Sequence, residues 1–349
     1  QRFEVQDKMR RFVPHLLYAL LCLLILLAVR SNLLNAYLQL IIMFMGVNII
    51  LSTSLNLVNG YMGEFSVGHA GFMAVGAYIT SVLNVWLFTS DRVFGPAVLP
   101  PASVIYLFPV TLLIGGIGAA LVGLLVAVPS FKTRGDYLAI ITLAVNYIVK
   151  SAIENIQVIG GARGFMGMRN VGNAMKDVAN IPWIMIWVFV GTGFSVWVIY
   201  RLVNSTYGKG VVAIRDDEIA AEIMGVDTRR MKMTAFMLSS GLAGVAGGLF
   251  AHILGYINPG TFTIMKSTEI MVMVYLGGMG SLSGSVLSAI GFTVILELFR
   301  PLQVAKWVVI PLLLILLMLF RPEGLLGNRE LTDVFPRLRR ILAPQGRQA

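Results

Sequence analysis

Stretches of mainly apolar residues alternate with short polar segments along the chain. A helix of about 20 apolar residues crosses a hydrocarbon core about 30 Å thick, and most of these stretches approach that length. We therefore expect membrane-spanning helices at residues 13–29, 33–58, 65–88, 104–129, 137–157, 181–203, 231–257, 268–280, 284–300 and 306–320. Ten crossings would place both ends of the chain on the same side of the membrane.

Composition and charge support this class and give it an orientation. Charged residues make up 13% of the 349 residues, against about 25% in an ordinary globular domain, and the mean hydropathy is +0.81. With the N-terminus inside, the inner segments hold most of the 27 Lys and Arg residues, as the positive-inside rule requires. We predict an all-α polytopic membrane protein with about ten (eight to ten) transmembrane helices and cytoplasmic termini. Residues 1–325 form the transmembrane domain, and residues 326–349 form a cytoplasmic tail.

Two glycine-rich breaks interrupt the apolar pattern: NLVNGYMGEFSVGHAGF between the second and third predicted spans, and LGGMGSLSGSV between the eighth and ninth. Both contain Met-Gly-x-[Phe/Leu]-Ser, which reflects either an internal duplication or chance. Broken backbone at membrane depth is tolerated where protein or water covers it, and broken helices often mark transport sites. The alternative is two tight hairpin turns with glycines at positive φ. On the transport interpretation, the pathway is lined by Asn56, Glu64, Ser66, His69, Gly278, Ser281 and Ser283.

Glu64 is the carboxylate in the first break. Carboxylates at membrane depth are costly and often functional, so Glu64 would bind a proton or contact a substrate amine. Alternatively, it lies near the inner surface and orders the turn. Few other acidic residues lie near the predicted spans, which favours an external energy source over coupling to an ion.

The most densely charged segment, GKGVVAIRDDEIAAEIMGVDTRRMK, comes directly before a long uncharged stretch. Charged residues cost roughly 2.5–3.5 kcal/mol each at a bilayer centre, so this segment is expected at the membrane surface. Residues 215–224 predict a helix with acidic residues at its positive N-terminal end and Gly225 at its C-terminus. Its small, partly apolar surface fits a groove on another protein. The alternative is an amphipathic connector on lipid headgroups.

Two further polar segments, residues 89–103 and 159–180, are predicted as loops on the outer side. The second carries Arg163, Arg169 and Lys176. It is either a solvated loop or a docking surface for an external protein.

Small residues recur at every fourth position within two of the predicted spans. They are Gly115, Ala119 and Gly123 in one span and Gly244 and Gly248 in the other. This spacing lets helix backbones approach closely, so we expect these spans to pack into a bundle.

Several enzymatic chemistries lack their residues in this sequence. Gly208-Lys209-Gly210 lacks the earlier glycine and the hydroxyl of a P-loop, and no G-x-S-x-G elbow occurs. The histidines and the single cysteine are too scattered for a zinc set; they are His15, His69, His252 and Cys22. An intramembrane serine hydrolase that pairs Ser281 or Ser283 with His252 remains an alternative. We otherwise expect a non-catalytic protein.

Taken together, several segments resemble one transporter family. They are LNLVNGYMGEFSVGHAGFMAVGAY, KTRGDYLAIITLAV, GGARGFMGMRN, IRDDEIAAEIMGVDTRRMKMTAFMLSSGLAGVAGGLFA, YLGGMGSLSGSVLSA and LFRPEGLLG. The chain resembles the LivM type of inner-membrane permease in ABC importers for branched-chain amino acids, along nearly its whole length after the first span.

The resemblance implies a multi-pass subunit of the bacterial inner membrane and a set of partners. The partners are a second, similar permease, two cytoplasmic ATPases and an external solute-binding protein. This chain would bind no cofactor itself, since ATP and Mg²⁺ would sit on the ATPases. The substrate would be a branched-chain or related amino acid. The alternatives are a urea or short-amide permease of the same family, and a channel or ion-coupled carrier that acts alone.

The resemblance also implies a coupling helix at about residues 212–226 that docks into an ATPase. ABC permeases carry E-A-A-x-x-x-G at this place, and here Ala220, Ala221 and Gly225 match its later part. Ile219 stands in the glutamate position, with Glu218 one residue earlier, so the resemblance leaves open which carboxylate contacts the ATPase. The residues expected to couple to the ATPase are Asp216, Asp217, Glu218, Ala220, Ala221, Glu222 and Gly225.

Overall fold

The structure is a computed structural model. It describes residues 2–90, 94–131, 137–301, 306–320, 324–327 and 329–331. Side chains are described in these ranges apart from residues 2–15, 306–307, 310, 313–314 and 317–318.

A helix forms at each predicted span. These helices are α1 (Arg2–Arg30), α2 (Ala36–Asn56), α3 (His69–Phe88), α4 (Val104–Ser130), α5 (Tyr137–Asn155), α7 (Trp183–Val203), α10 (Thr228–Leu254), α11 (Ile264–Gly277), α12 (Leu282–Leu298) and α13 (Lys306–Phe320). Within the described ranges, six of them are long and apolar enough to cross a membrane: α2 with its extension to Tyr61, α3, α4 with the turn before it, α5, α7 and α10. Three others are short: α11, α12 and α13 have 14, 17 and 15 residues. Ten crossings therefore stay a prediction, while a mostly helical chain with several spanning helices is confirmed.

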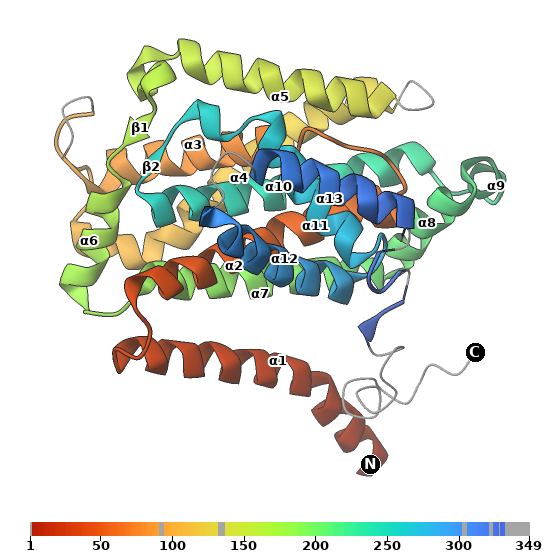
Figure 1. The fold of residues 1–349 in the computed structure, drawn as a ribbon, viewed down its shortest axis with the longest axis horizontal. Coiled ribbons are helices and arrows are strands. Elements are labelled where there is room, and N and C mark those ends of the chain that lie inside the picture. Colours follow the sequence, from red (N-terminus) through yellow and green to blue (C-terminus); the bar gives the residue numbers. More distant parts are fainter. Residues whose placement is uncertain are drawn as a thin grey trace.

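The long helices run roughly side by side, so the connecting segments gather at two ends of the bundle (Figure 1). One end carries α8 (Thr206–Asp216) and α9 (Glu218–Ile223), at the right of the figure. The other end carries α6 (Met168–Val178) and the strands β1 (Phe165–Met166) and β2 (Tyr256–Ile257). The strands pair antiparallel, with Phe165 opposite Ile257. The polar segments are thus sorted to two opposite ends, as the alternating pattern predicts.

The segment at residues 159–180, predicted as a polar loop, contains a helix. Three apolar side chains of α6, those of Met168, Val171 and Met175, are fully buried. They recur at spacings of three and four residues, which places them on one face of the helix. The predicted outer loop at residues 89–103 ends in a 3₁₀ turn at Pro101–Ser103, and its residues 91–93 lie outside the described residues.

Close glycine contacts hold α10 at the centre of the bundle, against α3 and α4. A Cβ atom at Gly247 would lie 1.9 Å from the carbonyl oxygen of Met73, and one at Gly76 would lie 2.2 Å from the Cα atom of Gly244. On the α4 side, a Cβ atom at Gly244 would lie 2.5 Å from the Cβ atom of Ala119. The small-residue spacing seen in the sequence therefore marks true backbone approach between helices.

We predict that Gly247→Ala destabilises the protein although alanine is the better helix former. The added methyl group would meet the Met73 backbone, and overpacking of this kind costs about 1–3 kcal/mol. Gly291→Ala in α12 is the matched control, because no atom lies within 4 Å of a Cβ atom there. Thermal unfolding of both variants in detergent should show a lower midpoint for Gly247→Ala alone; equal midpoints would contradict the packing.

Candidate functional site

The charged segment at one end of the bundle forms two helices that meet at Asp217. A single helix over residues 215–224 was expected, but Asp217 has extended backbone (φ −160°, ψ 108°) and separates α8 from α9. Its carboxylate accepts hydrogen bonds from the backbone N–H groups of Ile219 (2.9 Å) and Ala220 (3.0 Å). Aspartate in this role stabilises a new helix start, which explains why the helix breaks here. Asp216 consequently lies in the last turn of α8 rather than at a helix N-terminus.

The C-terminal end of α9 is closed by a Schellman motif. Gly225 adopts a left-handed conformation (φ +84°). Its N–H donates to the carbonyl of Glu222 at 2.9 Å, and the N–H of Val226 donates to the carbonyl of Ala221 at 3.0 Å. Caps at both ends give this short helix a defined shape and direction.

α9 presents an exposed apolar face at the end of the bundle. Ile219, Ile223 and Met224 are 62%, 80% and 83% exposed, whereas Ala221 is buried against the body of the protein. Three large apolar side chains gathered on one capped helix form a surface suited to a groove on another protein. We call this surface the α9 face.

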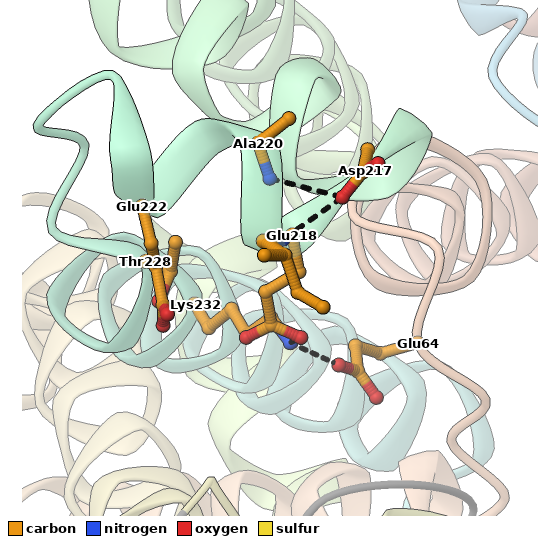
Figure 2. A network of polar contacts seen from close by, with 8 residues as sticks. Glu64, Asp217, Glu218, Ala220, Glu222, Thr228 and Lys232 are labelled. Atoms are coloured by element: carbon orange, nitrogen blue, oxygen red, sulfur yellow. Dashed lines mark hydrogen bonds and ion pairs between the residues drawn. The ribbon is translucent and has the colours of Figure 1, made fainter.

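A buried lysine connects α9 to the first glycine-rich break. The ammonium group of Lys232, in α10, donates to Glu64 Oε1 at 2.6 Å and lies 2.8 Å from Glu218 Oε2 (Figure 2). The Lys232 side chain is only 8% exposed, while those of Glu64 and Glu218 are 21% and 43% exposed. Its Nζ atom also lies 5.9 Å from the centre of the Phe131 ring. One cation thus joins two carboxylates that stand more than 150 residues apart; we call this contact the lysine bridge.

α9 is also linked directly to the start of α10, since the hydroxyl of Thr228 donates to Glu222 Oε1 at 2.9 Å. In Figure 2 this pair lies on the opposite side of Lys232 from Glu64. Glu218 and Glu222 therefore attach the buried side of α9 to α10 at two points one helical turn apart.

α8 contacts the first break through Arg215. The guanidinium of Arg215 donates to Asp216 Oδ1 at 2.9 and 3.1 Å and to the carbonyl of Gly60 at 3.3 Å. Its stem lies against Gly63, where a Cβ atom would be 2.6 Å from Arg215 Cγ. Gly63 has φ +76°, a conformation that glycine tolerates best. Both helices of the charged segment thus rest on the same break.

The two glycine-rich breaks, far apart in sequence, lie against each other. The first begins as a π-helix at Leu57–Tyr61 and ends where α3 starts at His69. Asn56 accepts a hydrogen bond from the N–H of Gly280 (3.0 Å) and donates to the Ser281 carbonyl (3.0 Å) and Ser285 Oγ (2.8 Å). A Cβ atom at Gly60 would lie 2.3 Å from the Gly280 nitrogen. We call this junction the inter-break contact.

Polar contacts continue from the inter-break contact along α2 and α12. Asn48 Nδ2 donates to Thr293 Oγ1 at 2.9 Å, and Ser52 Oγ donates to the Ser285 carbonyl at 3.3 Å. Asn48, Ser52 and Asn56 are spaced by four residues and therefore share one face of α2. Because the polar groups satisfy one another, this buried interface tolerates hydrophilic side chains at membrane depth.

The other predicted residues of the first break are buried beside α2. His69 Nε2 lies 2.8 Å from Ser54 Oγ. The N–H of Ser66 donates to Asn59 Oδ1 at 3.2 Å, whereas the buried Ser66 hydroxyl has no hydrogen-bond partner among the described residues. Neither residue contacts the lysine bridge.

The second break is held by Glu330, which the sequence analysis placed in the tail. Its carboxylate accepts hydrogen bonds from the N–H groups of Leu282 (2.9 Å) and Ser283 (3.0 Å), from the Ser283 hydroxyl, and from the Tyr61 hydroxyl at 3.3 Å. Ser281 is the N-cap of α12, because its hydroxyl accepts from the Gly284 N–H at 3.0 Å. Glu330 therefore stabilises the start of α12 and ties it to the first break. Residues 332–349 of the predicted tail lie outside the described residues.

Gly278 provides the turn of the second break, with φ +108°. Next to it, the N–H groups of Leu325 and Leu326 donate to the carbonyls of Leu276 (2.8 Å) and Gly277 (3.2 Å). Residues on both sides of the predicted boundary at residue 325 therefore pack against the same turn.

In the structure, the polar contacts of His252 are with residues other than Ser281 and Ser283. Its Nε2 atom lies 3.0 Å from Asn84 Nδ2 and its Nδ1 atom 2.8 Å from the Gly248 carbonyl. It lies in the last turn of α10, next to the strand end of the bundle, whereas Ser281 and Ser283 contact Glu330 and residue 329. His252 therefore does not pair with Ser281 or Ser283, as the serine hydrolase interpretation requires.

Most of the predicted pathway residues thus form two groups, while Ser66 and His69 lie apart from both. Asn56, Gly278, Ser281 and Ser283 belong to the second break and its contacts, and Glu64 joins the charged segment through Lys232. Lys232, Arg215 and Glu330 were not predicted as site residues. Lys232 lies near the start of α10, where a lysine side chain usually extends to the lipid headgroups. No local sequence signal reveals which carboxylate it contacts. Within the described ranges, no three His, Cys, Asp or Glu side chains gather as metal ligands.

Comparisons with known proteins agree with this architecture. Residues 37–320 match the family model described as the permease component of the branched-chain amino acid transport system. The chain is 33% identical over 302 residues to the high-affinity branched-chain amino acid transport system permease protein LivM of Escherichia coli K12, covering 80% of this chain and 67% of that protein. It is 23% identical over 327 residues to a probable LivM of Methanocaldococcus jannaschii, covering 84% and 94% of the two chains.

A second group of relatives is more distant. The permease LivH of Escherichia coli K12 is 28% identical over 177 residues, which cover 49% of this chain and 56% of LivH. The comparison with solved structures found no match.

We predict that Lys232→Met destabilises the protein, because it leaves two carboxylates facing each other without their cation. An unpaired, partly buried charge costs about 1–3 kcal/mol. Lys209→Met is the matched control, since Lys209 is an exposed lysine of the neighbouring helix α8. Thermal unfolding should show a lower midpoint for Lys232→Met and little change for Lys209→Met.

A second substitution tests the cause of that loss. Adding Glu64→Gln to Lys232→Met removes one of the two stranded charges, and part of the lost stability should return. If the double variant is no more stable than Lys232→Met, the lysine bridge does not act through charge.

Proposed function

The chain belongs to the family of permease components of branched-chain amino acid transport systems, and on this basis we propose that it is the LivM-like subunit that an ABC ATPase drives. It is a multi-pass protein of the inner membrane and a transport subunit rather than an enzyme. The proposed cargo is a branched-chain amino acid delivered from an external solute-binding protein. This cargo is favoured over urea or short amides because the names of the relatives described above refer to branched-chain amino acid transport.

The α9 face is the observation that supports ATPase docking. Ile219, Ile223 and Met224 are exposed at the end of the bundle that this proposal places in water, and apolar surface in contact with water is unfavourable in free energy. Burial in a groove of a second protein offsets this cost. We therefore propose that the coupling element is α9 itself, with Asp217 and Gly225 shaping it, rather than one helix over 212–226.

Glu218 and Glu222 take a different role in this proposal from the one expected from sequence. Both point toward α10, to Lys232 and Thr228, and so anchor α9 to the permease. Ala220, exposed on α9, would approach the ATPase, whereas Asp216, exposed in the last turn of α8, is held by Arg215. In this proposal Glu218 and Glu222 therefore transmit movement from α9 to α10, and they do not make the first contact with the ATPase.

The path of the proposed coupling runs through contacts that the structure shows. Movement of α9 would pull on Lys232 through Glu218, and Lys232 in turn holds Glu64 of the first break. Arg215 adds a second connection from α8 to Gly60. Because the first break rests on the second through Asn56, a shift there would separate α2 from α12 and open the pathway at this end.

The arrangement in the membrane completes the proposal. The end that carries α8 and α9 faces the cytoplasm, with both termini on that side and ten crossings in between. Two ATPases, which hold ATP and Mg²⁺, dock there, and a second, similar permease completes the pathway. The opposite end, with α6 and the strand pair, faces the binding protein.

We predict that Ile223→Lys abolishes co-purification of the ATPases and coupled transport while the permease still folds. Ile223 is 80% exposed, so lysine costs the isolated subunit little but introduces a charge into the proposed groove. Val178→Lys is the matched control for co-purification of the ATPases alone, because Val178 is a half-exposed apolar residue at the opposite end of the bundle, which the proposal assigns to the binding protein.

The measurement is affinity purification of the tagged permease, followed by ATPase assays and leucine uptake into proteoliposomes. Retention of the ATPases by Ile223→Lys, with normal uptake, would show that α9 is not the docking helix.

A further inference from the structure

A cleft of about 440 Å³ opens between the first break, α8 and α11. Its charged lining comes from Glu64, Arg215 and Asp216, and its polar lining includes Asn59. It lies beside the inter-break contact, because Gly60 lines the cleft and also packs against Gly280. A cleft of this size is in the range of sites for small molecules.

The charged groups around the cleft keep unused hydrogen-bonding capacity. A guanidinium has five N–H donors, and the contacts of Arg215 with Asp216 and Gly60 use three. Glu64 binds Lys232 through Oε1 alone, and Figure 2 shows its other oxygen pointing away from that lysine. The cleft thus offers donors for a carboxylate beside an acceptor for an ammonium group.

Asn59 contributes a buried amide to the cleft. The residue is only 5% exposed, and its Nδ2 group makes no hydrogen bond of normal geometry among the described residues, although the amide lies close to the Tyr275 hydroxyl. Leaving a buried donor without a good hydrogen bond is costly, so such groups usually find a partner. An acceptor atom of a bound molecule would supply it.

The remaining wall of the cleft is apolar. Phe65, Tyr275 and Met279 line it, and the rings of Phe65 and Tyr275 lie 6.5 Å apart. An aliphatic side chain placed against these residues would leave water. The cleft therefore combines a cation, anions and an apolar wall.

We propose that this cleft is an exit-side binding site for a zwitterionic α-amino acid with an apolar side chain. Arg215 and Asn59 hold the carboxylate, Glu64 and Asp216 hold the ammonium group, and Phe65, Tyr275 and Met279 contact the side chain. This deepens the proposed function, on which it rests, by giving the substrate a release site on this chain. Because Glu64 and Arg215 also connect the cleft to α9, ATPase movement would alter the site and favour release.

The test measures binding of L-leucine to the purified permease–ATPase complex in nanodiscs, without the binding protein, by saturation-transfer NMR. Two probes each lack one charge of leucine: 4-methylpentanoate and 3-methylbutylamine. We expect saturable binding of L-leucine and at least about tenfold weaker binding of each probe, since one charge-assisted hydrogen bond accounts for that factor.

Variants separate the cleft from other surfaces. Arg215→Gln removes the carboxylate partner, and Met279→Trp fills the cleft without changing charge; both should weaken leucine binding about tenfold or more. Arg229→Gln is the control, because Arg229 is exposed at the same end and does not line the cleft. Unchanged melting temperature and ATPase content would show that the variants are folded.

The outcomes distinguish this proposal from the proposed function. If Arg215→Gln and Met279→Trp bind leucine like the unaltered protein, or if either probe binds as tightly as leucine, the site assignment is wrong. A complex that transports leucine but shows no binding without the binding protein overturns the site and leaves the proposed function standing. If no ATPase co-purifies, the proposed function fails, and leucine binding is then measured on the permease alone.

Discussion

The contact on which the functional end of this protein depends is the buried ammonium of Lys232 between Glu64 and Glu218. A charge with 8% exposure at the start of an otherwise uncharged helical stretch is stable only with partners in place. Those partners come from the first glycine-rich break and from the first turn of α9. The position of α9 relative to the break is consequently set by tertiary contacts, with the lysine bridge as the direct link, rather than by the covalent chain between them.

The two breaks owe their irregular backbone to mutual protection. Polar backbone that leaves a helix at membrane depth needs hydrogen-bond partners, and Asn56 supplies two of them to the opposing break, beside a third bond to the Ser285 hydroxyl. Glu330 does the same for the start of α12 and reaches Tyr61 of the first break. A structure held by a few directional contacts between breaks, beside rigid helices packed through glycines, concentrates any movement at the breaks.

The sequence predicted part of this site, and the physical reason for the limits differs from residue to residue. Asp217 and Gly225 were expected at the two ends of a helix and lie there, because helix-dipole and C-terminal glycine signals act over a few positions. The division of the expected helix at Asp217 was missed, since acidic residues at 216–218 fit a helix start at any of these positions. Glu64 was recognised as unusual from its place in the break, but its lysine partner could not be, because the pairing spans 168 residues.

By itself, the sequence determined where the helices lie, because burial of apolar length and exclusion of charge are properties of each segment alone. It also determined the two breaks and the family. Only the tertiary structure decided which charges meet, that the two breaks form one junction, and that α9 turns Ile223 and Met224 outward while Glu218 and Glu222 face the protein. These features depend on how helices distant in sequence pack together, and packing geometry is not encoded in any single stretch of the chain.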